Sequence, residues 1–384
     1  MKVLQTIAGF GAKSGGTSTC TYDLLKALQQ IGCDTELLTP NIKGSNDSLM
    51  GVGENWIKTV DNDSISPYGY SNNIKRFLQN SNYDIYHTNG LWMHCNHITC
   101  AIARKKGTPY IITPHGMLYP DALKRSYWKK WPLIQLFFKK DIMSANCIHA
   151  TCTQEMENIR AFGYKGPIAV IGNPANIPSY INELKGRDKS SKLMTFGFLG
   201  RLHPRKKVEN LLYGIAKCPL EKQKQIHLVI MGKGDEQYES FLRKEVEHLG
   251  LSKNVEFKGF VNGREKFEQL SQLHALFVPS DFENFGMIVT EALACKTPVF
   301  ASLGTPWEEL NKRKCGWWMD RTPDNIAKVM SQIIDMPSDE IEAMGERGCN
   351  LVKEKFTAES VASQMQELYK WILGKAEKPE FVYL

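Results

Sequence analysis

Short apolar runs alternate along this chain with longer segments in which apolar residues recur every three or four positions. The short runs predict buried strands, and the periodic segments predict amphipathic helices. In the first half, the predicted strands are 3–7, 35–39, 84–87, 110–113, 147–151 and 168–171. In the second half, they are 194–199, 226–230, 255–257, 275–278 and 298–301. Two successive series of strand–helix units predict an α/β fold with two Rossmann-like domains, each a parallel sheet covered by helices.

The domain boundaries follow from a change in composition. Residues 174–190 combine Pro, Asn, Ser, Gly and charges with little periodicity, so we place the interdomain linker there. We predict an N-terminal domain over 1–175, a C-terminal domain over 176–355, and a C-terminal helix over 356–384 that packs back on the N-terminal domain. Ligands of parallel sheets bind at the carboxyl ends of the strands, so the cleft between the domains is predicted to hold the site.

One strand–turn–helix segment, 276–294, carries the strongest chemical signal. Its helix start suits a phosphate, because the first N–H groups of a helix lack internal partners and the helix dipole points the same way. We place those groups at four consecutive residues: Asn284, Phe285, Gly286 and Met287. Glu283 lies in the turn, and Glu291 lies about two turns inside the helix. A carboxylate repels phosphate, so both are predicted to meet hydroxyl groups of a ribose or a sugar. An ordinary strand–helix unit with two solvated glutamates fits the spacing equally well.

Two further turns follow predicted strands of the first half. The first contains Gly15 and Gly16, which open a helix and allow a backbone to approach a ligand; it matches neither a dinucleotide fingerprint nor a Walker A loop. The second contains His115 beside Gly116, where an imidazole can donate or accept a hydrogen bond in the cleft. Purely structural roles are the alternative for both turns.

A basic loop follows the first strand of the second half. It contains Arg201, Arg205, Lys206 and Lys207. Several cations on one loop at a strand end suit a diphosphate. A solvated basic loop accounts for Arg205 and Lys207 equally well, but less readily for Arg201, which lies directly after the strand.

Composition narrows the class of protein. The chain has 384 residues, a net charge of +7, and ten cysteines without regular spacing. These values predict a cytoplasmic protein with free thiols and no nucleic-acid-binding module. No apolar run approaches the ~20 residues that span a bilayer. A cluster of His94, Cys95, His97 and Cys100 resembles a zinc site only superficially, because no second pair accompanies it.

Residues 122–140 interleave six cations with five aromatic residues. Such a segment suits an anionic membrane surface, with Trp128, Trp131, Phe137 and Phe138 in the headgroup layer. In the alternative interpretation, the aromatic residues belong to the core and the lysines are solvated.

Taken in order, these motifs resemble the GT-B glycosyltransferases of the family-4 type, which are retaining and use nucleotide sugars. The resemblance covers nearly the whole chain and includes Gly15-Gly16, Pro114-His115-Gly116, the loop from Gly200 to Lys206, and the Glu-x7-Glu pair formed by Glu283 and Glu291. Met117-Leu118 and residues 304–309 further resemble members that build bacterial capsule, exopolysaccharide or O-antigen.

The resemblance implies a role for each site residue. Arg201 and Lys206 would neutralise the donor diphosphate, the amides from Asn284 to Met287 would bind phosphate or sugar, and Glu291 would hold the ribose. His115 and Glu283 would face the transferred sugar, and Gly16 would approach the diphosphate. Backbone near Phe260 would recognise the base. Two positions depart from the family pattern: Lys207 stands where glycine is usual, and Asn89 where a second histidine is common.

The resemblance also implies that no metal or other cofactor is needed. The expected reaction moves a hexose to a saccharide acceptor, lipid-linked at the inner face of the plasma membrane. Two alternatives stay open: a soluble-acceptor synthase of the sucrose or trehalose type, and a non-catalytic nucleotide-sugar-binding protein.

Overall fold

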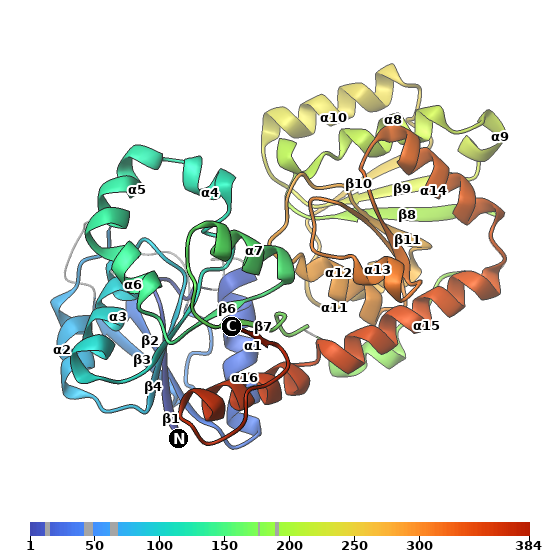
Figure 1. Cartoon of the computed structure of the whole chain (residues 1–384). Coiled ribbons are helices and arrows are strands. Elements are labelled where there is room, and N and C mark those ends of the chain that lie inside the picture. Colours follow the sequence, from blue (N-terminus) through green and yellow to red (C-terminus); the bar gives the residue numbers. More distant parts are fainter. Residues whose placement is uncertain (12–15, 42–48, 62–67, 176, 189–191) are drawn as a thin grey trace. The chain divides into compact units, whose positions relative to one another are not determined.

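The computed structural model describes residues 1–11, 16–41, 49–61, 68–175, 177–188 and 192–384. The chain forms two compact units: Met1–Pro174 with Ala358–Leu384 is unit 1, and Ala175–Thr357 is unit 2. Each is an α/β unit built on a mainly parallel sheet, which confirms the predicted fold class (Figure 1). The chain therefore passes between the units twice, after Pro174 and after Thr357.

The sheet of unit 1 has the strand order β14-β7-β6-β5-β4-β1-β2-β3 in the described residues, and only β14 runs antiparallel to its neighbour. Its strands are β1 (Lys2–Ile7), β2 (Asp34–Asn41), β3 (Ile57–Asp61), β4 (Ile85–Asn89), β5 (Tyr110–Thr113), β6 (Cys147–Ala150), β7 (Ile168–Val170) and β14 (Val382–Tyr383). The sequence pattern does not predict β3 or β14. Both are sheet edges, where β3 is half solvated and β14 has only two residues.

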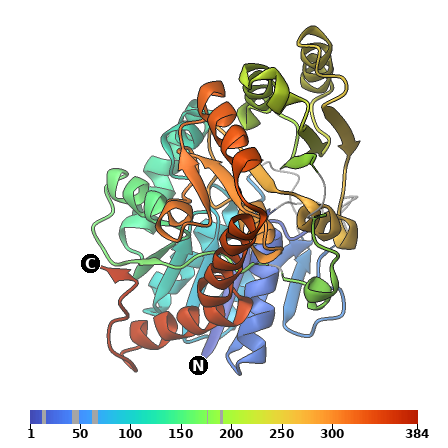
Figure 2. The same cartoon turned by 90° about the vertical axis from the view of Figure 1, so that its right-hand side faces the viewer.

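Helices cover both faces of this sheet. They are α1 (Gly16–Gln30), α2 (Asn72–Asn80), α3 (His94–Lys106), α4 (Pro120–Lys124), α5 (Tyr127–Leu133), the π-helix η1 (Ile134–Phe138), α6 (Lys139–Met143), α7 (Thr153–Ala161) and α16 (Ala358–Ile372). On one face, α16 lies beside α1, and both bury leucines against the strands (Figures 1 and 2). On the other face, α2, α3 and α6 pack over Leu4, Tyr86 and Ile112.

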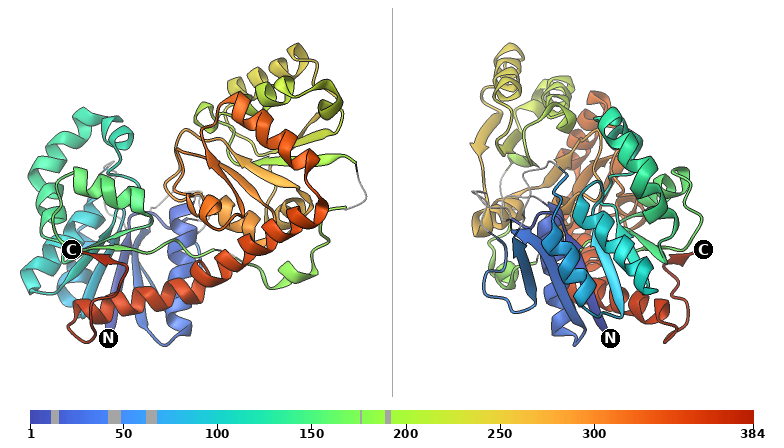
Figure 3. Two further views of the ribbon diagram at one scale, coloured as in Figure 1. Left: turned by 45° about the vertical axis from the view of Figure 1, so that its right-hand side comes forward. Right: turned by 90° about the vertical axis from the view of Figure 1, so that its left-hand side faces the viewer.

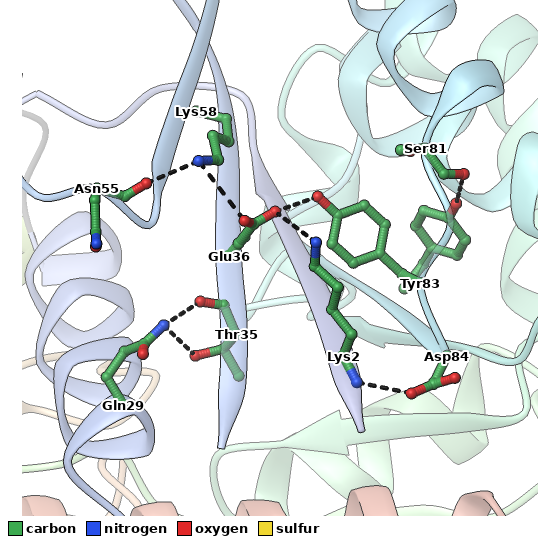
Figure 4. A network of polar contacts seen from close by, with 10 residues as sticks. Lys2, Gln29, Thr35, Glu36, Asn55, Lys58, Ser81, Tyr83 and Asp84 are labelled. Carbon is green, nitrogen blue, oxygen red and sulfur yellow. Dashed lines mark hydrogen bonds and ion pairs between the residues drawn. The ribbon is translucent and has the colours of Figure 1, made fainter. Parts of the chain in front are cut away.

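A polar network ties the amino-terminal ends of the strands together (Figure 4). Glu36 on β2 accepts a hydrogen bond from the Tyr83 hydroxyl and lies 3.7 Å from Lys2 Nζ and 3.6 Å from Lys58 Nζ. The Lys2 amide donates to Asp84 at 2.7 Å. This network lies at the amino-terminal ends of the strands, whereas the predicted site residues follow the carboxyl ends. It therefore links neighbouring strands without occupying the end of the sheet where the site is predicted.

The sheet of unit 2 has the order β10-β9-β8-β11-β12-β13, all parallel. Its strands are β8 (Met194–Leu199), β9 (Ile226–Met231), β10 (Val255–Gly259), β11 (Ala275–Val278), β12 (Val299–Ser302) and β13 (Gly316–Met319). The helices are α8 (Glu209–Lys217), α9 (Leu220–Gln223), α10 (Glu236–His248), α11 (Gly263–Gln272), α12 (Met287–Ala294), α13 (Glu309–Lys312), α14 (Pro323–Asp335) and α15 (Ser338–Lys355), with 3-10 turns η2 (Ser179–Glu183) and η3 (Pro204–Lys206).

The core of unit 2 lies on both faces of its sheet. On one face, α14 lies against α8 over the apolar side chains of β8, β9 and β11 (Figure 3). On the other, α12 is buried along most of its length, with Val289, Ala292 and Leu293 against the strands. Because β8 and β11 are neighbours, the loops that follow them meet at one edge of the sheet.

Candidate functional site

The loops after β8 and β11 form a charged cluster in unit 2. The Asp281 amide donates to the Arg205 carbonyl at 2.7 Å, which joins the two loops. Lys206 Nζ forms an ion pair with Glu283, and Ser280 Oγ donates to the same carboxylate at 2.8 Å. The structure thus brings two predicted site residues, Lys206 and Glu283, into direct contact.

Arg201 lies at the carboxyl end of β8 with an exposed side chain. Among the residues that the structure describes, its guanidinium has no ion-pair or hydrogen-bond partner. Lys207, by contrast, lies 3.8 Å from carboxylate oxygens of both Glu209 and Asp281. Its φ of +52° belongs to the left-handed region, where glycine is favoured. That conformation explains physically why glycine is the residue usual at this position in the family.

The loop before α12 is held by its backbone. The Glu283 amide donates to the Gly304 carbonyl at 3.0 Å, and Trp307 Nε1 donates to the Phe285 carbonyl at 2.5 Å. A Cβ at Gly304 would lie 2.0 Å from the Asp281 carbonyl oxygen, so only glycine fits there. These contacts set the path of the chain from the strand end to the helix.

The helix start differs from the prediction. Helix α12 begins at Met287, after Gly286 with φ +79°, so Asn284 and Phe285 precede the helix and do not form its first turn. The Phe285 side chain is buried against Trp307, with ring centroids 5.3 Å apart. Any contact that Phe285 makes with a ligand must therefore come from its backbone. The glycine, which needs the left-handed conformation, delays the helix by three residues.

Glu291 is accordingly about one turn inside α12 and not two. Its side chain is 11% exposed, and its carboxylate lies 2.6 Å from Lys266 Nζ on α11. Burial raises the pKa of Glu291, and the adjacent Lys266 ammonium opposes that rise. The sequence analysis missed Lys266 as the partner of this candidate site residue, because nothing at its own position distinguishes it from any other helix lysine.

The remaining predicted donor residues are dispersed. Phe260 follows β10 and Gly259, whose φ is +83°, and its ring is 67% exposed. Gly16 is the exposed first residue of α1, and a Cβ there would meet no atom within 4 Å, so no local crowding requires glycine. Gly15 lies outside the described residues.

His115 follows β5 in unit 1 with φ +52°, an uncommon conformation for a histidine. Its Nε2 lies 3.1 Å from Asn89 Oδ1. Burial, reinforced by His149, lowers the pKa of His115 to about 3. The imidazole is therefore neutral at physiological pH.

The turn after His115 is held by Glu155, which the sequence analysis also missed. This buried carboxylate accepts from the Gly116 amide at 2.5 Å, and from the Thr151 amide and hydroxyl at 2.8 and 2.7 Å. Burial raises the pKa of Glu155, and these hydrogen bonds lower it in part. Its residue type and position do not distinguish it in sequence from the exposed Glu157 on the same helix.

The segment from 122 to 140 divides between the two interpretations. Phe138 is 1% exposed and packs on Trp92, and Phe137 packs against His97 at 4.6 Å, so the prediction that both lie in a headgroup layer is wrong. Trp128 is 86% exposed and Trp131 is 48% exposed. The π-helix turns the two phenylalanines inward, which an i, i+4 pattern does not anticipate.

The cations of the 122–140 segment also differ from one another in exposure. Lys124, Arg125, Lys139 and Lys140 are exposed. Lys130 instead donates to the Ala122 carbonyl at 2.5 Å, and burial lowers its pKa. The Lys129 side chain lies outside the described part of the chain.

The described residues contain no group of three or more His, Cys, Asp or Glu side chains that could hold a metal ion. In the superficial zinc cluster, His94 Nδ1 accepts from the Ser71 amide at 3.3 Å, while His97 Nδ1 lies 2.7 Å from Asp141. All ten cysteines are buried and free. Throughout the described ranges, no helix is both long and apolar enough to cross a membrane.

Comparison with known proteins supplies the family. Residues 14–177 match the family model described as Glycosyltransferase Family 4, and residues 182–350 match Glycosyl transferases group 1. A lipopolysaccharide 1,6-galactosyltransferase of Salmonella typhimurium is 29% identical over 317 residues, which are 78% of each chain.

Other relatives match over shorter segments. An uncharacterized glycosyltransferase of Methanocaldococcus jannaschii is 30% identical over 45% of this chain and 44% of its own length. A mouse alpha-1,3/1,6-mannosyltransferase is 29% identical over 39% and 38%, respectively. The chain thus spans less than half the length of these two curated relatives.

Solved structures share the fold. An Anabaena protein in complex with UDP has a TM-score of 0.74 at 17% identity, and the match covers 97% of this chain and 100% of that one. A sucrose-phosphate synthase from Thermosynechococcus elongatus has a TM-score of 0.76 at 19% identity, over 98% and 100%. Since the two family models between them match most of both units, the chain belongs to the GT-B glycosyltransferases of the family-4 type.

Proposed function

We propose that this protein is a retaining, metal-independent glycosyltransferase that moves a hexose from a nucleotide diphosphate sugar to a lipid-linked saccharide in bacterial surface-polysaccharide assembly. The carrying observation is the cluster in unit 2, where Arg201 and Lys206 stand beside the loop that leads into α12. The match to the Salmonella galactosyltransferase over 78% of both chains supports the pathway.

The chemistry follows from the charges. A leaving diphosphate gains negative charge in the transition state, and cations that are already in place stabilise it without reorganisation. Arg201 has an exposed guanidinium for one phosphate. Lys206 is held by Glu283, so a bound diphosphate and Glu283 would share one ammonium group. In the proposed site these two cations take the place of a divalent metal beside the diphosphate.

The other residues bind the ribose, the phosphates and the transferred sugar of the donor. Glu291 would hold the ribose hydroxyls, with Lys266 keeping the carboxylate ionised in its buried position. Glu283 would face the transferred sugar, and His115 would contact the same sugar as a neutral imidazole. Backbone amides from Asn284 to Met287 and at Gly16 would bind phosphate.

Replacement of Arg201 tests the site. Arg201→Ala should lower turnover by about 2–4 kcal/mol of transition-state stabilisation, or roughly 30- to 1000-fold, while the fold persists. Arg205→Ala is the matched control, because the exposed Arg205 guanidinium is on the same loop and lies over the Phe282 ring, 5.6 Å from its centroid. The assay is sugar release from a panel of UDP- and GDP-sugars. Equal activity of the two folded variants would remove Arg201 from the site.

The donor base is set by contacts near Phe260, whose exposed ring follows the end of β10. Backbone contacts leave no trace in residue identity, so UDP and GDP remain alternatives. Calorimetric titration of the protein with each diphosphate separates them. A protein that binds neither would contradict the proposed donor class, and one that binds but never transfers would be the non-catalytic alternative.

Peripheral membrane association belongs to the same proposal and would place the protein at the inner face of the plasma membrane. In sequence, the exposed side chains of Trp128, Trp131 and Leu136 are flanked by four exposed cations: Lys124, Arg125, Lys139 and Lys140. Basic and aromatic side chains together suit anionic lipid, at about 1 kcal/mol for each cation near the surface. A synthase that acts on a soluble acceptor would not need a membrane-binding surface.

Co-sedimentation with vesicles decides between the two acceptor types. Wild type should pellet with anionic vesicles at low salt, and changing Lys139 and Lys140 to Glu should release it. Changing Lys222 and Lys224, which are ion-paired lysines of unit 2, is the control. Failure of wild type to pellet at low salt would favour a soluble acceptor.

A further inference from the structure

A line of hydrogen bonds crosses the core of unit 1 towards His115. It starts at the backbone carbonyl of Ile171, which can only accept. His149 Nε2 lies 2.8 Å from that oxygen and must carry its proton, which leaves His149 Nδ1 as an acceptor. Thr113 Oγ1, 2.9 Å from that nitrogen, donates to it. The Thr113 oxygen must then accept from His87 Nε2, which is 2.7 Å away.

The second half of the line continues in the same direction. His87 Nδ1 is now an acceptor, and the Tyr369 hydroxyl on α16 donates to it at 2.9 Å. The Tyr369 oxygen accepts from Gln5 Nε2 at 3.0 Å, and Gln5 Oε1 accepts from Asn89 Nδ2 at 2.9 Å. Asn89 Oδ1 is left to accept from His115 Nε2 at 3.1 Å. Every donor and acceptor is thus assigned from one carbonyl.

Burial makes this direction hard to reverse. Gln5, Thr113, His87 and Tyr369 are fully buried, so reversing one bond would place two donors or two acceptors face to face without water. Burial also lowers the pKa of His149 to about 4, so the ring is neutral and has a single proton to place.

We propose that this line, the core relay from Ile171 to Asn89, fixes His115 in the Nε2–H tautomer, so that its Nδ1 accepts a hydrogen bond from a hydroxyl of the transferred sugar. Within the described residues, His115 Nδ1 has no hydrogen-bond partner, and the ring is partly exposed. The part about the sugar rests on the proposed function. Asn89, Gln5 and Tyr369 are then positioning residues that act through His115.

The tautomer is measured directly by NMR. The full-length protein is labelled with ring-15N histidine, and the signals of His115 are assigned by their loss in His115→Gln. In wild type, Nε2 should show the shift and proton coupling of a protonated ring nitrogen, and Nδ1 the shift of an unprotonated one. An Nδ1–H tautomer for His115 would overturn the proposal without any further variant.

The relay is tested by removing one hydroxyl. Tyr369→Phe keeps the ring but breaks the line between His87 and Gln5, and it should change the His115 tautomer ratio roughly tenfold, the usual net effect of one hydrogen bond. Tyr164→Phe is the matched control, because its equally buried hydroxyl donates to the Ala145 carbonyl outside the relay. An unchanged tautomer ratio in folded Tyr369→Phe would overturn the relay.

Turnover then separates the relay from the function. Tyr369→Phe should lower kcat more than it changes KM for the donor, and Tyr164→Phe should leave both unchanged. If the tautomer behaves as proposed but His115→Gln transfers sugar normally, the assignment of His115 to the sugar fails and the tautomer result stands.

Discussion

Neutral histidines in the core should make unit 1 sensitive to acid. His149 is 3% exposed and donates to a backbone carbonyl, and its pKa is lowered from 6.5 to about 4, mainly by burial. Between these two pH values the unfolded chain binds a proton at His149 and the folded chain does not. The stabilisation is therefore complete above about pH 6.5 and is lost as the pH falls towards 4.

The magnitude follows from the gap of about 2.5 between the two pKa values. Each pH unit in that interval costs about 1.4 kcal/mol per proton, so His149 alone should remove about 3 kcal/mol of unfolding free energy by pH 4. Glu155 acts in the opposite direction, because its raised pKa makes the folded state bind a proton more readily as the pH falls. A comparison between variants cancels that opposing contribution.

The assay is urea unfolding of wild type and His149→Gln at several pH values. A short deuterium pulse at one fixed pH reports how much of strand Cys147–Ala150 has unfolded. The free-energy difference between the two proteins should shrink by about 1.4 kcal/mol per pH unit between pH 6 and 4.5. His248→Gln, at an exposed histidine of unit 2, is the control variant. A pH-independent difference for His149→Gln would mean that the folded and unfolded chains bind the His149 proton equally over this interval, so the core would not hold the ring neutral.

Three further changes have defined outcomes. Glu155→Gln should lower the unfolding free energy measured in urea by about 1–3 kcal/mol, because an amide nitrogen cannot accept from a backbone N–H. The control is Glu157→Gln on the exposed side of the same helix, which should have little effect. Lys266→Met should raise KM for the donor with little change in kcat, because Glu291 is assigned to the unreacting ribose; a fall in kcat alone would contradict that role. Lys207→Gly should raise the Tm by relieving the positive φ, and a lower Tm would show that the ion pairs of Lys207 outweigh its strain.

Much of the fold was predictable because buried parallel strands are continuous apolar runs. Strands 110–113, 194–199 and 275–278 have the same bounds in the structure as in the sequence analysis. The sequence pattern did not predict β13, because its tryptophans are only half buried at a sheet edge. Edge strands face solvent and lose the apolar signature on which the prediction depends.

The site was less predictable, since its geometry depends on contacts distant in sequence. Glu283 and Glu291 stand out by their spacing, but the lysine beside Glu291 is 25 residues away on another helix. The late start of α12 depends on the φ of Gly286, which no neighbouring residue identity specifies. Phe138 points into the core because a π-helix adds one residue to the turn, and local periodicity does not contain that addition.

The double passage between the units has a consequence for synthesis on the ribosome. Unit 2 is one continuous stretch, Ala175–Thr357, inserted into unit 1, whose last helix supplies Val361, Met365 and Leu368 to the core beneath α1. During translation, unit 2 leaves the ribosome whole while unit 1 still lacks one of the two helices on this face of its sheet. The first unit to begin is therefore the last to finish, and part of its apolar sheet face stays uncovered throughout the synthesis of the second. A nascent chain stalled before Ala358 should be the species that chaperones bind most strongly.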